Sequence, residues 1–87
     1  FTKGLAAELA GDNINVNSVG PGNVWTPGTA RGGVSKEAFE ERLASRTPLG
    51  RTQTPEDIGR TVAFLASEDA KNITGQALLV NGGRVMY

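Results

Sequence analysis

The chain has 87 residues, carries nine basic and nine acidic side chains, and contains neither cysteine nor histidine. A formal charge of zero concentrates no positive potential, which argues against nucleic acids and anionic membranes as partners. Without cysteine and histidine the chain forms no Ser-His-Asp triad, cysteine nucleophile or conventional zinc site, and we expect no metal. Its longest apolar run, residues 62–66, is too short to span a membrane. We therefore expect a soluble, cytoplasmic protein.

The first ten residues have a helical pattern. Phe1, Leu5 and Leu9 follow one another at a spacing of four, which places them on one helix face. Gly11 is suited to a left-handed C-cap. No capping side chain precedes Phe1, so we expect that the sequence begins inside a helix and that further residues lie upstream.

Residues 14–19, INVNSV, predict the first strand, because the segment alternates and is rich in β-branched residues. Pro21 is expected to end this strand, since proline cannot donate a hydrogen bond to a ladder.

Dense proline and glycine in residues 23–34 predict a long surface loop, a type that often serves as a lid or binding segment. Ser35 is then expected to cap a helix over residues 36–45, in which Phe39 and Leu43 share a face.

The clearest local signal is Thr54-Pro55-Glu56-Asp57. Thr54 is a helix N-cap, Pro55 occupies the tolerated first position, and Asp57 stands at the capping-box position. The predicted helix runs to about Ala66. Its predicted buried face comprises Ile58, Val62 and Leu65.

One more turn is expected within residues 67–72, and residues 77–80, ALLV, predict a second strand ended by residues 81–83. Two apolar strands separated by helices predict parallel neighbours in an α/β layer, each needing cover on both faces. Because two parallel strands form no stable sheet alone, we expect the rest of the sheet to come from residues outside this sequence.

The stretch at residues 17–28, NSVGPGNVWTPG, follows the first predicted strand, where open α/β sheets bind ligands. Gly22 allows close approach to the backbone, Val24 offers its N–H and C=O to an amide, and the Thr26 hydroxyl can donate to a carboxamide or phosphate oxygen. An ordinary turn explains the same residues, because proline and glycine punctuate most loops. The residues alone leave both interpretations open.

Three blocks carry a family resemblance. Residues 16–27, VNSVGPGNVWTP, resemble the VNxhxPGxVxTP segment of the short-chain dehydrogenase/reductase family. Residues 55–67, PEDIGRTVAFLAS, resemble its PEDI…VxFLAS helix, and residues 73–83, ITGQALLVNGG, its ITGQxLxVDGG strand. The blocks keep the family's order and spacing and cover nearly the whole chain. Two residues depart from the pattern: Asn81 replaces the usual Asp, and Gly20 replaces a small residue that has a side chain.

The resemblance implies that residues 1–87 are the C-terminal segment of a single NAD(P)-binding Rossmann domain, a doubly wound parallel α/β sheet of which these are the last two strands. The family's Tyr-x-x-x-Lys pair, its Ser and its glycine-rich loop lie upstream, so no catalytic residue is assigned in this chain. Tyr87 has no Lys four positions on and is interpreted as a surface or interface aromatic.

The resemblance also implies a cofactor, NAD or NADP. Pro21 and Gly22 match the turn that packs against the nicotinamide ring, Val24 matches the backbone contact to the carboxamide, and Thr26 matches a hydroxyl that bonds the carboxamide or a phosphate.

Substrate contacts are less determined. Asn23 and Trp25 flank the cofactor residues and are candidates for binding substrate, although core packing or anchoring of the lid explains Trp25 equally well. Three arginines are available to an anionic substrate, but solvated or paired arginines are the favoured interpretation. These are Arg31, Arg46 and Arg51.

The function implied is an oxidoreductase that interconverts a carbonyl and an alcohol of a small molecule by hydride transfer, with a Tyr outside this chain as general acid–base. This segment would supply nicotinamide contacts, a substrate lid and part of a homotetramer interface formed by the helix at residues 54–66 and the last strand. The segment alone is expected to be inactive. The alternative is a non-catalytic dinucleotide-binding or assembly module of the same fold, because no proton-transferring residue of the family lies in the chain.

Overall fold

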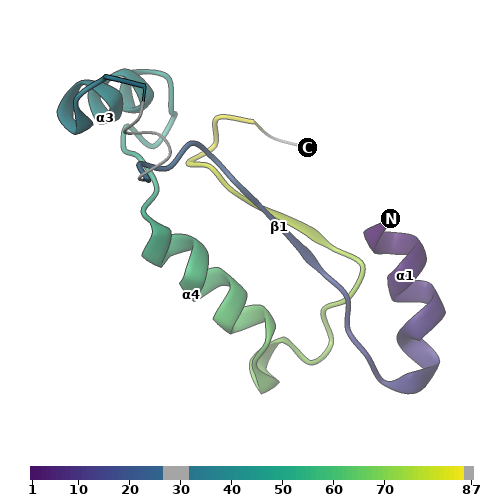
Figure 1. Cartoon of the computed structure of the whole chain (residues 1–87). Coiled ribbons are helices and arrows are strands. Elements are labelled where there is room, and N and C mark those ends of the chain that lie inside the picture. Colours follow the sequence, from purple (N-terminus) through teal and green to yellow (C-terminus); the bar gives the residue numbers. More distant parts are fainter. Residues whose placement is uncertain (27–31, 86–87) are drawn as a thin grey trace.

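The computed structural model describes residues 1–26 and 32–85 and shows an α/β arrangement (Figure 1). Its elements are α1 (Thr2–Leu9), the 3-10 turn η1 (Ala10–Asp12), β1 (Ser18–Pro21), α3 (Lys36–Ser45), α4 (Pro55–Leu65), the 3-10 turn η2 (Glu68–Ala70) and β2 (Ala77–Val80). The predicted order of helices and strands is confirmed. Part of the predicted loop, residues 27–31 with Arg31, and the terminal Tyr87 lie outside the described residues.

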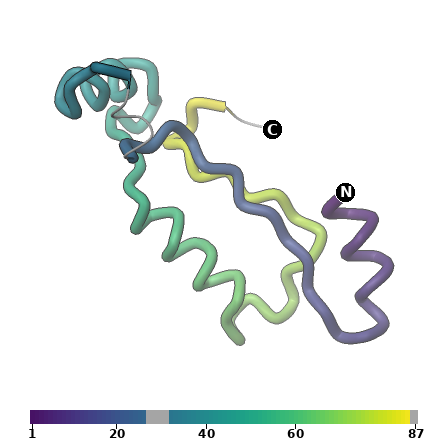
Figure 2. Tube along the Cα trace, viewed as in Figure 1, coloured from purple at the N-terminus to yellow at the C-terminus, as the bar shows by residue number. Residues whose placement is uncertain are grey.

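The two strands pair in parallel, as predicted, with a register that runs from Ser18 opposite Ala77 to Pro21 opposite Val80. In Figures 1 and 2, α1 and α4 lie on opposite sides of this ribbon, and α3 lies beyond its end. The carboxyl ends of both strands therefore point toward the part of the molecule that holds α3.

The first strand ends at Pro21, as predicted, and includes that residue, but the predicted start is wrong because β1 begins four residues later than expected. Proline is tolerated there because only alternate residues of β1 donate their N–H groups to β2. The Ser18 N–H donates to Gln76 O and the Gly22 N–H donates to Val80 O, each at 2.9 Å. Pro21 is out of phase with these donors, so its missing N–H leaves no bond to β2 unmade.

Asparagine side chains bind the residues just before β1 to the segment that leads into β2. The Asn17 amide donates to Ile73 O at 2.9 Å and accepts from the Gln76 N–H at 3.1 Å. The Asn15 amide donates to Lys71 O at 2.8 Å. Apart from the bond from the Gly75 N–H to Val16 O, side chains thus take the place of backbone ladder bonds here, which explains the late start of β1.

The helix caps follow local chemistry, with one difference from prediction. The Ser35 hydroxyl accepts from the Ala38 N–H at 3.1 Å, as expected of an N-cap. Gly11 is not the C-cap of the first helix, because the chain continues into η1 and Asn13 takes the left-handed conformation with φ of 60°. Asparagine is among the few residues with a side chain that adopt this conformation readily.

The chain is open rather than tightly packed. Its radius of gyration is 15.7 Å, against about 12 Å for a compact domain of this length. Ile58 and Leu65 are half-buried, but Val62 is 49% exposed, so the prediction that Val62 is buried is wrong for this chain. The reason is geometric: a two-stranded ribbon offers α4 too little surface to cover its apolar face.

The capping box at the start of α4 links stability to pH. The Thr54 N–H donates to Asp57 Oδ2 at 2.8 Å, and the Asp57 N–H donates to Thr54 Oγ1 at 3.1 Å. The bond from the Thr54 backbone, followed by that from its side chain, lowers the pKa of Asp57 below its ordinary value. A carboxyl with a lowered folded-state pKa stabilises the fold above its unfolded pKa, and this stabilisation is lost as the pH falls through the folded pKa.

We therefore expect Asp57→Asn to reduce the midpoint of urea unfolding at pH 7 and to differ progressively less from the wild type as the pH falls below about 4. Thr54→Ala removes the other half of the box and is expected to lose about 1 kcal/mol at pH 7. A difference between wild type and Asp57→Asn that stays constant from neutral to acidic pH would contradict this account.

Candidate functional site

The parallel register brings the two strand ends to one edge. Gly22, directly after β1, donates its N–H to Val80 O, so the turn after β1 lies beside the Asn81 turn that follows β2. Ligands of open α/β sheets bind beyond this edge. The residues predicted from the sequence to bind cofactor and substrate form one continuous segment there, which we call the strand-end loop (residues 21–26).

Neighbouring protein atoms crowd the position that a side chain at Gly22 would take. A Cβ at this position would lie 2.7 Å from Gln53 Oε1 and 3.1 Å from Asn81 Cα and Cβ. The first distance is shorter than any ordinary contact and the other two are tight, so a side chain here would displace the Gln53 amide and shift the Asn81 turn by a few tenths of an ångström. The sequence prediction explained Gly22 by close approach of a ligand, whereas the structure shows that protein occupies the side where a Cβ would stand.

The strand-end loop continues past β1 by a further backbone pairing. Val24 forms an isolated parallel bridge with Gln53, the residue just before the cap of α4. Val24 and Trp25 are half-buried, and Asn23 and Thr26 are exposed. The loop therefore keeps an extended course beyond the sheet and leaves polar side chains on its surface.

Trp25 packs against the helix that follows the loop. Its ring meets that of Phe39 in α3 edge to face, with centroids 5.3 Å apart and an interplanar angle of 62°. Aromatic pairs prefer this geometry. Of the two interpretations that the sequence left open for Trp25, packing rather than substrate contact thus has direct support.

Three residues that the sequence analysis did not single out also build this edge: Thr47, Gln53 and Gly82. Thr47 is buried, and its hydroxyl donates to Leu43 O at 2.7 Å at the end of α3. The Leu49 N–H donates to Gly82 O at 3.1 Å, which fixes the segment after α3 onto the turn after β2. Only the Gly82-Gly83 pair gave a signal in the sequence, as the end of a strand.

Both departures from the family pattern have a structural account. The Asn81 amide donates to Val85 O and accepts from the Gly83 N–H, each at 3.0 Å. An aspartate would keep only the second bond, because a carboxylate has no donor. At Gly20, a Cβ would lie 2.8 Å from Leu79 Cδ2, so the Leu79 side chain occupies the space that a larger residue would need.

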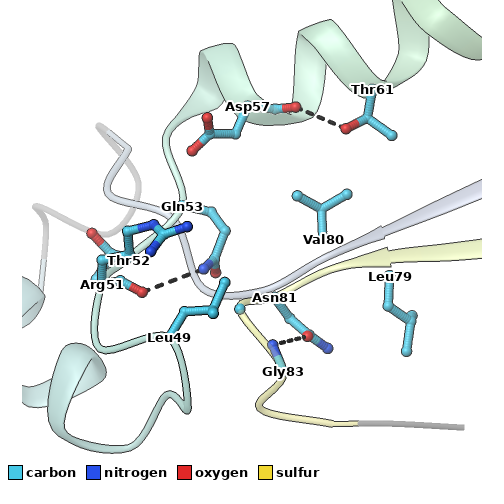
Figure 3. Close-up of a pocket in the computed structure, with 11 residues that line it drawn as sticks. Leu49, Arg51, Thr52, Gln53, Asp57, Thr61, Leu79, Val80, Asn81 and Gly83 are labelled. Atoms are coloured by element: carbon cyan, nitrogen blue, oxygen red, sulfur yellow. Dashed lines mark hydrogen bonds between the residues drawn. The ribbon is translucent and has the colours of Figure 1, made fainter.

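A cavity of about 450 Å³ opens between the end of β2, the segment at residues 49–53 and the start of α4 (Figure 3). Asp57 and Thr61 line it, but the Asp57 carboxylate is bonded within the capping box and the Thr61 hydroxyl donates to Asp57 O at 3.0 Å. The capping interpretation of Asp57 is confirmed, and neither group is placed as an acid or base. Gln53, Thr52 and Asn81 separate this cavity from one of about 10 Å³ beside Gly22 and Asn23.

A family model described as enoyl-(acyl carrier protein) reductase matches residues 1–84. The structure also superposes on a short-chain dehydrogenase/reductase from Brucella melitensis, a glucose/ribitol dehydrogenase by title, with a TM-score of 0.84 and 36% identity over 99% of this chain and 34% of that one. The chain belongs to this short-chain dehydrogenase/reductase family. Its α/β arrangement is accordingly part of a Rossmann-type sheet.

Other family members are equally similar. The 3-oxoacyl-(acyl-carrier-protein) reductase of Thermotoga maritima is 44% identical over 86 residues, which cover 99% of this chain and 34% of the relative. YwfH, an NADPH-dependent reductase involved in bacilysin biosynthesis, gives a TM-score of 0.83 at 36% identity over 99% of this chain and 35% of that chain. The chain thus spans about a third of the length of these family members. Among helices in the described ranges, none is long and apolar enough to cross a bilayer.

In this short-chain dehydrogenase/reductase segment, a substitution at Gly82 tests whether the close packing at the carboxyl ends of the strands contributes to stability. Its φ is +64°, and a Cβ there would collide with Thr47 Cγ2 and lie 2.9 Å from Gln53 Nε2. Gly33 has a similar φ of +78°, but no atom lies within 4 Å of where its Cβ would stand. A substitution at Gly33 therefore measures the cost of backbone strain without the cost of a collision. We expect Gly33→Ala to cost about 1–2 kcal/mol of unfolding free energy and Gly82→Ala clearly more. Equal losses in urea unfolding would show that the contacts around Gly82 do not matter.

Proposed function

We propose that the chain is the C-terminal segment, residues 1–87, of an NAD(P)-dependent oxidoreductase that interconverts a carbonyl and an alcohol of a small molecule. The observation that supports this most is family membership over residues 1–84 together with the strand-end loop at the shared carboxyl edge. The named relatives are reductases and dehydrogenases, and one of them is NADPH-dependent by title.

The strand-end loop fits a nicotinamide. When bound, the nicotinamide supplies or accepts the hydride, and the chain's own residues hold it in place. Gly22 packs against Gln53 and Asn81 on one side, while Pro21 beside it is exposed and available to one face of the ring. In this proposal the Val24 backbone meets the carboxamide, and the exposed Thr26 hydroxyl bonds the carboxamide or a phosphate.

The substrate side is proposed to include Asn23, which is exposed, and Trp25, which packs on Phe39 of α3. Proton transfer is assigned to a Tyr outside this chain, and the chain itself is assigned no catalytic residue.

Oligomerisation belongs to the same proposal. Several large apolar side chains of α4 and β2 are exposed, namely Val62, Phe64 and Leu78. We propose that the remainder of the sheet and a neighbouring subunit of a homotetramer cover them, since proteins rarely leave such patches in water. The cytoplasmic location expected from the sequence stays a prediction.

The full-length protein should oxidise NADH or NADPH in the presence of a carbonyl panel, while residues 1–87 alone should not. Thr26→Ala is expected to raise the KM for the cofactor about tenfold, because it removes one hydrogen bond to a polar or charged group. Ser67→Ala removes a hydroxyl at the far end of α4, where it donates to Phe64 O, and should leave that KM unchanged. Cofactor binding without turnover of any carbonyl would favour the non-catalytic module, and an absence of both would overturn the proposal.

Variants of Trp25 and Phe39 distinguish the two roles considered for Trp25, which are anchoring of α3 and contact with the substrate. If Trp25 only anchors α3, Trp25→Ala and Phe39→Ala should change the substrate KM alike, with a coupling of about 0.5–1.5 kcal/mol in a double-mutant cycle. If Trp25 also forms a substrate wall, as proposed, Trp25→Ala should raise the substrate KM well beyond Phe39→Ala. Steady-state kinetics across the carbonyl panel measures the difference, and matching values would exclude the wall.

A further inference from the structure

Gln53 is the support that the strand-end loop meets after the sheet ladder ends. The ladder of β1 stops at the Gly22 N–H, which bonds Val80 O. Two residues later Val24 pairs with Gln53 in an isolated parallel bridge. The backbone of Gln53 thus meets the middle of the strand-end loop, between the turn at Pro21 and Gly22 and the hydroxyl of Thr26.

The side chain of Gln53 fills the space that two glycines leave open. Its Oε1 lies 2.7 Å from where a Cβ of Gly22 would stand, and its Nε2 lies 2.9 Å from the corresponding point at Gly82. Figure 3 shows the amide extending from the segment before α4 toward the Asn81 turn. One amide therefore lies between the turns that follow both strands.

Packing, rather than hydrogen bonding, is the main effect of this side chain. Among the residues that the structure describes, the amide makes one hydrogen bond, from Nε2 to Arg51 O, and at 3.4 Å this bond is weak. Gln53 lines two cavities that differ greatly in volume, one of about 450 Å³ and one of about 10 Å³. Shortening the side chain would join these spaces and free the strand-end loop to move toward the Gly82 turn.

We propose that Gln53 is a positioning residue that holds the strand-end loop in the geometry that receives the nicotinamide. The inference rests on the proposed function. Gln53 touches no reacting atom in this account and acts through Gly22 and Val24. A loop that carries binding groups needs such support, because displacements of about 1 Å at a binding site already weaken it strongly.

The chain contains a matched control. Gln76, just before β2, also donates its side-chain amide to the carbonyl two residues earlier, Thr74 O, at 3.3 Å. It lies at the opposite end of the strand from Gln53. Gln76→Ala therefore removes the same kind of bond without affecting the strand-end loop.

In the full-length protein, Gln53→Ala is expected to raise the KM for the cofactor about tenfold with kcat within about twofold, and with little change in Tm. Gln53→Met keeps the length and shape of the side chain and should stay close to the wild type. Gln76→Ala should leave the KM unchanged. The inference is overturned if Gln53→Ala leaves the KM for the cofactor unchanged. It is also overturned if Gln53→Ala lowers the Tm enough to account for its higher KM and Gln76→Ala lowers the Tm equally.

A second measurement separates this inference from the proposed function. Fluorotryptophan is incorporated, and the ¹⁹F signal of Trp25 is assigned by its loss in Trp25→Phe. We expect Gln53→Ala to shift or broaden this signal and Gln76→Ala to leave it unchanged. If the signal responds but the wild type neither binds nor turns over cofactor, the proposed function fails while the support of the loop by Gln53 stands. If Gln53→Ala does not fold, Gln53→Asn, one methylene shorter, replaces it in both measurements.

Discussion

The parallel register between β1 and β2 is the constraint on which the candidate site depends. It places Pro21 opposite Val80 and so sets the turn after one strand against the turn after the other. Because both turns contain glycine, their backbones approach closely enough for a single side chain, that of Gln53, to contact both. A shift of one residue in this register would turn every side chain of a strand to the other face and separate these contacts.

The segment between the strands is fixed to this edge at two places. Near its start, Trp25 packs against Phe39 of α3. After α3, the Leu49 N–H bonds Gly82 O, and the buried Thr47 lies against the same turn. Helix α3 thus contacts the strand-end loop through Phe39, and the segment that follows it is bonded to the turn after β2, while the body of the helix lies beyond the strands (Figure 1).

Local features were predictable from the sequence, and features that depend on distant residues were not. The caps at Ser35 and Thr54 involve partners three residues away, so the pattern alone indicated them. The late start of β1 depends on Asn17 side-chain bonds to residues 56 and 59 positions along the chain, which no local pattern contains. Gln53 has no motif of its own, and its importance follows only from the two glycines it meets in space. For Gly22, the sequence indicated that a side chain is excluded but not which atoms exclude it.

The asparagine bonds before β1 also bear on how this part of the protein can change during evolution. Together with the strand pairing they close a chain loop of more than fifty residues that contains α3 and α4. The entropy of closing a loop grows only with the logarithm of its length, so even doubling it costs about 0.6 kcal/mol. Insertions and deletions between the clamped ends are therefore thermodynamically inexpensive. Changes of length can accumulate in the segment that carries α3 and α4 while the carboxyl edge of the ribbon keeps its geometry.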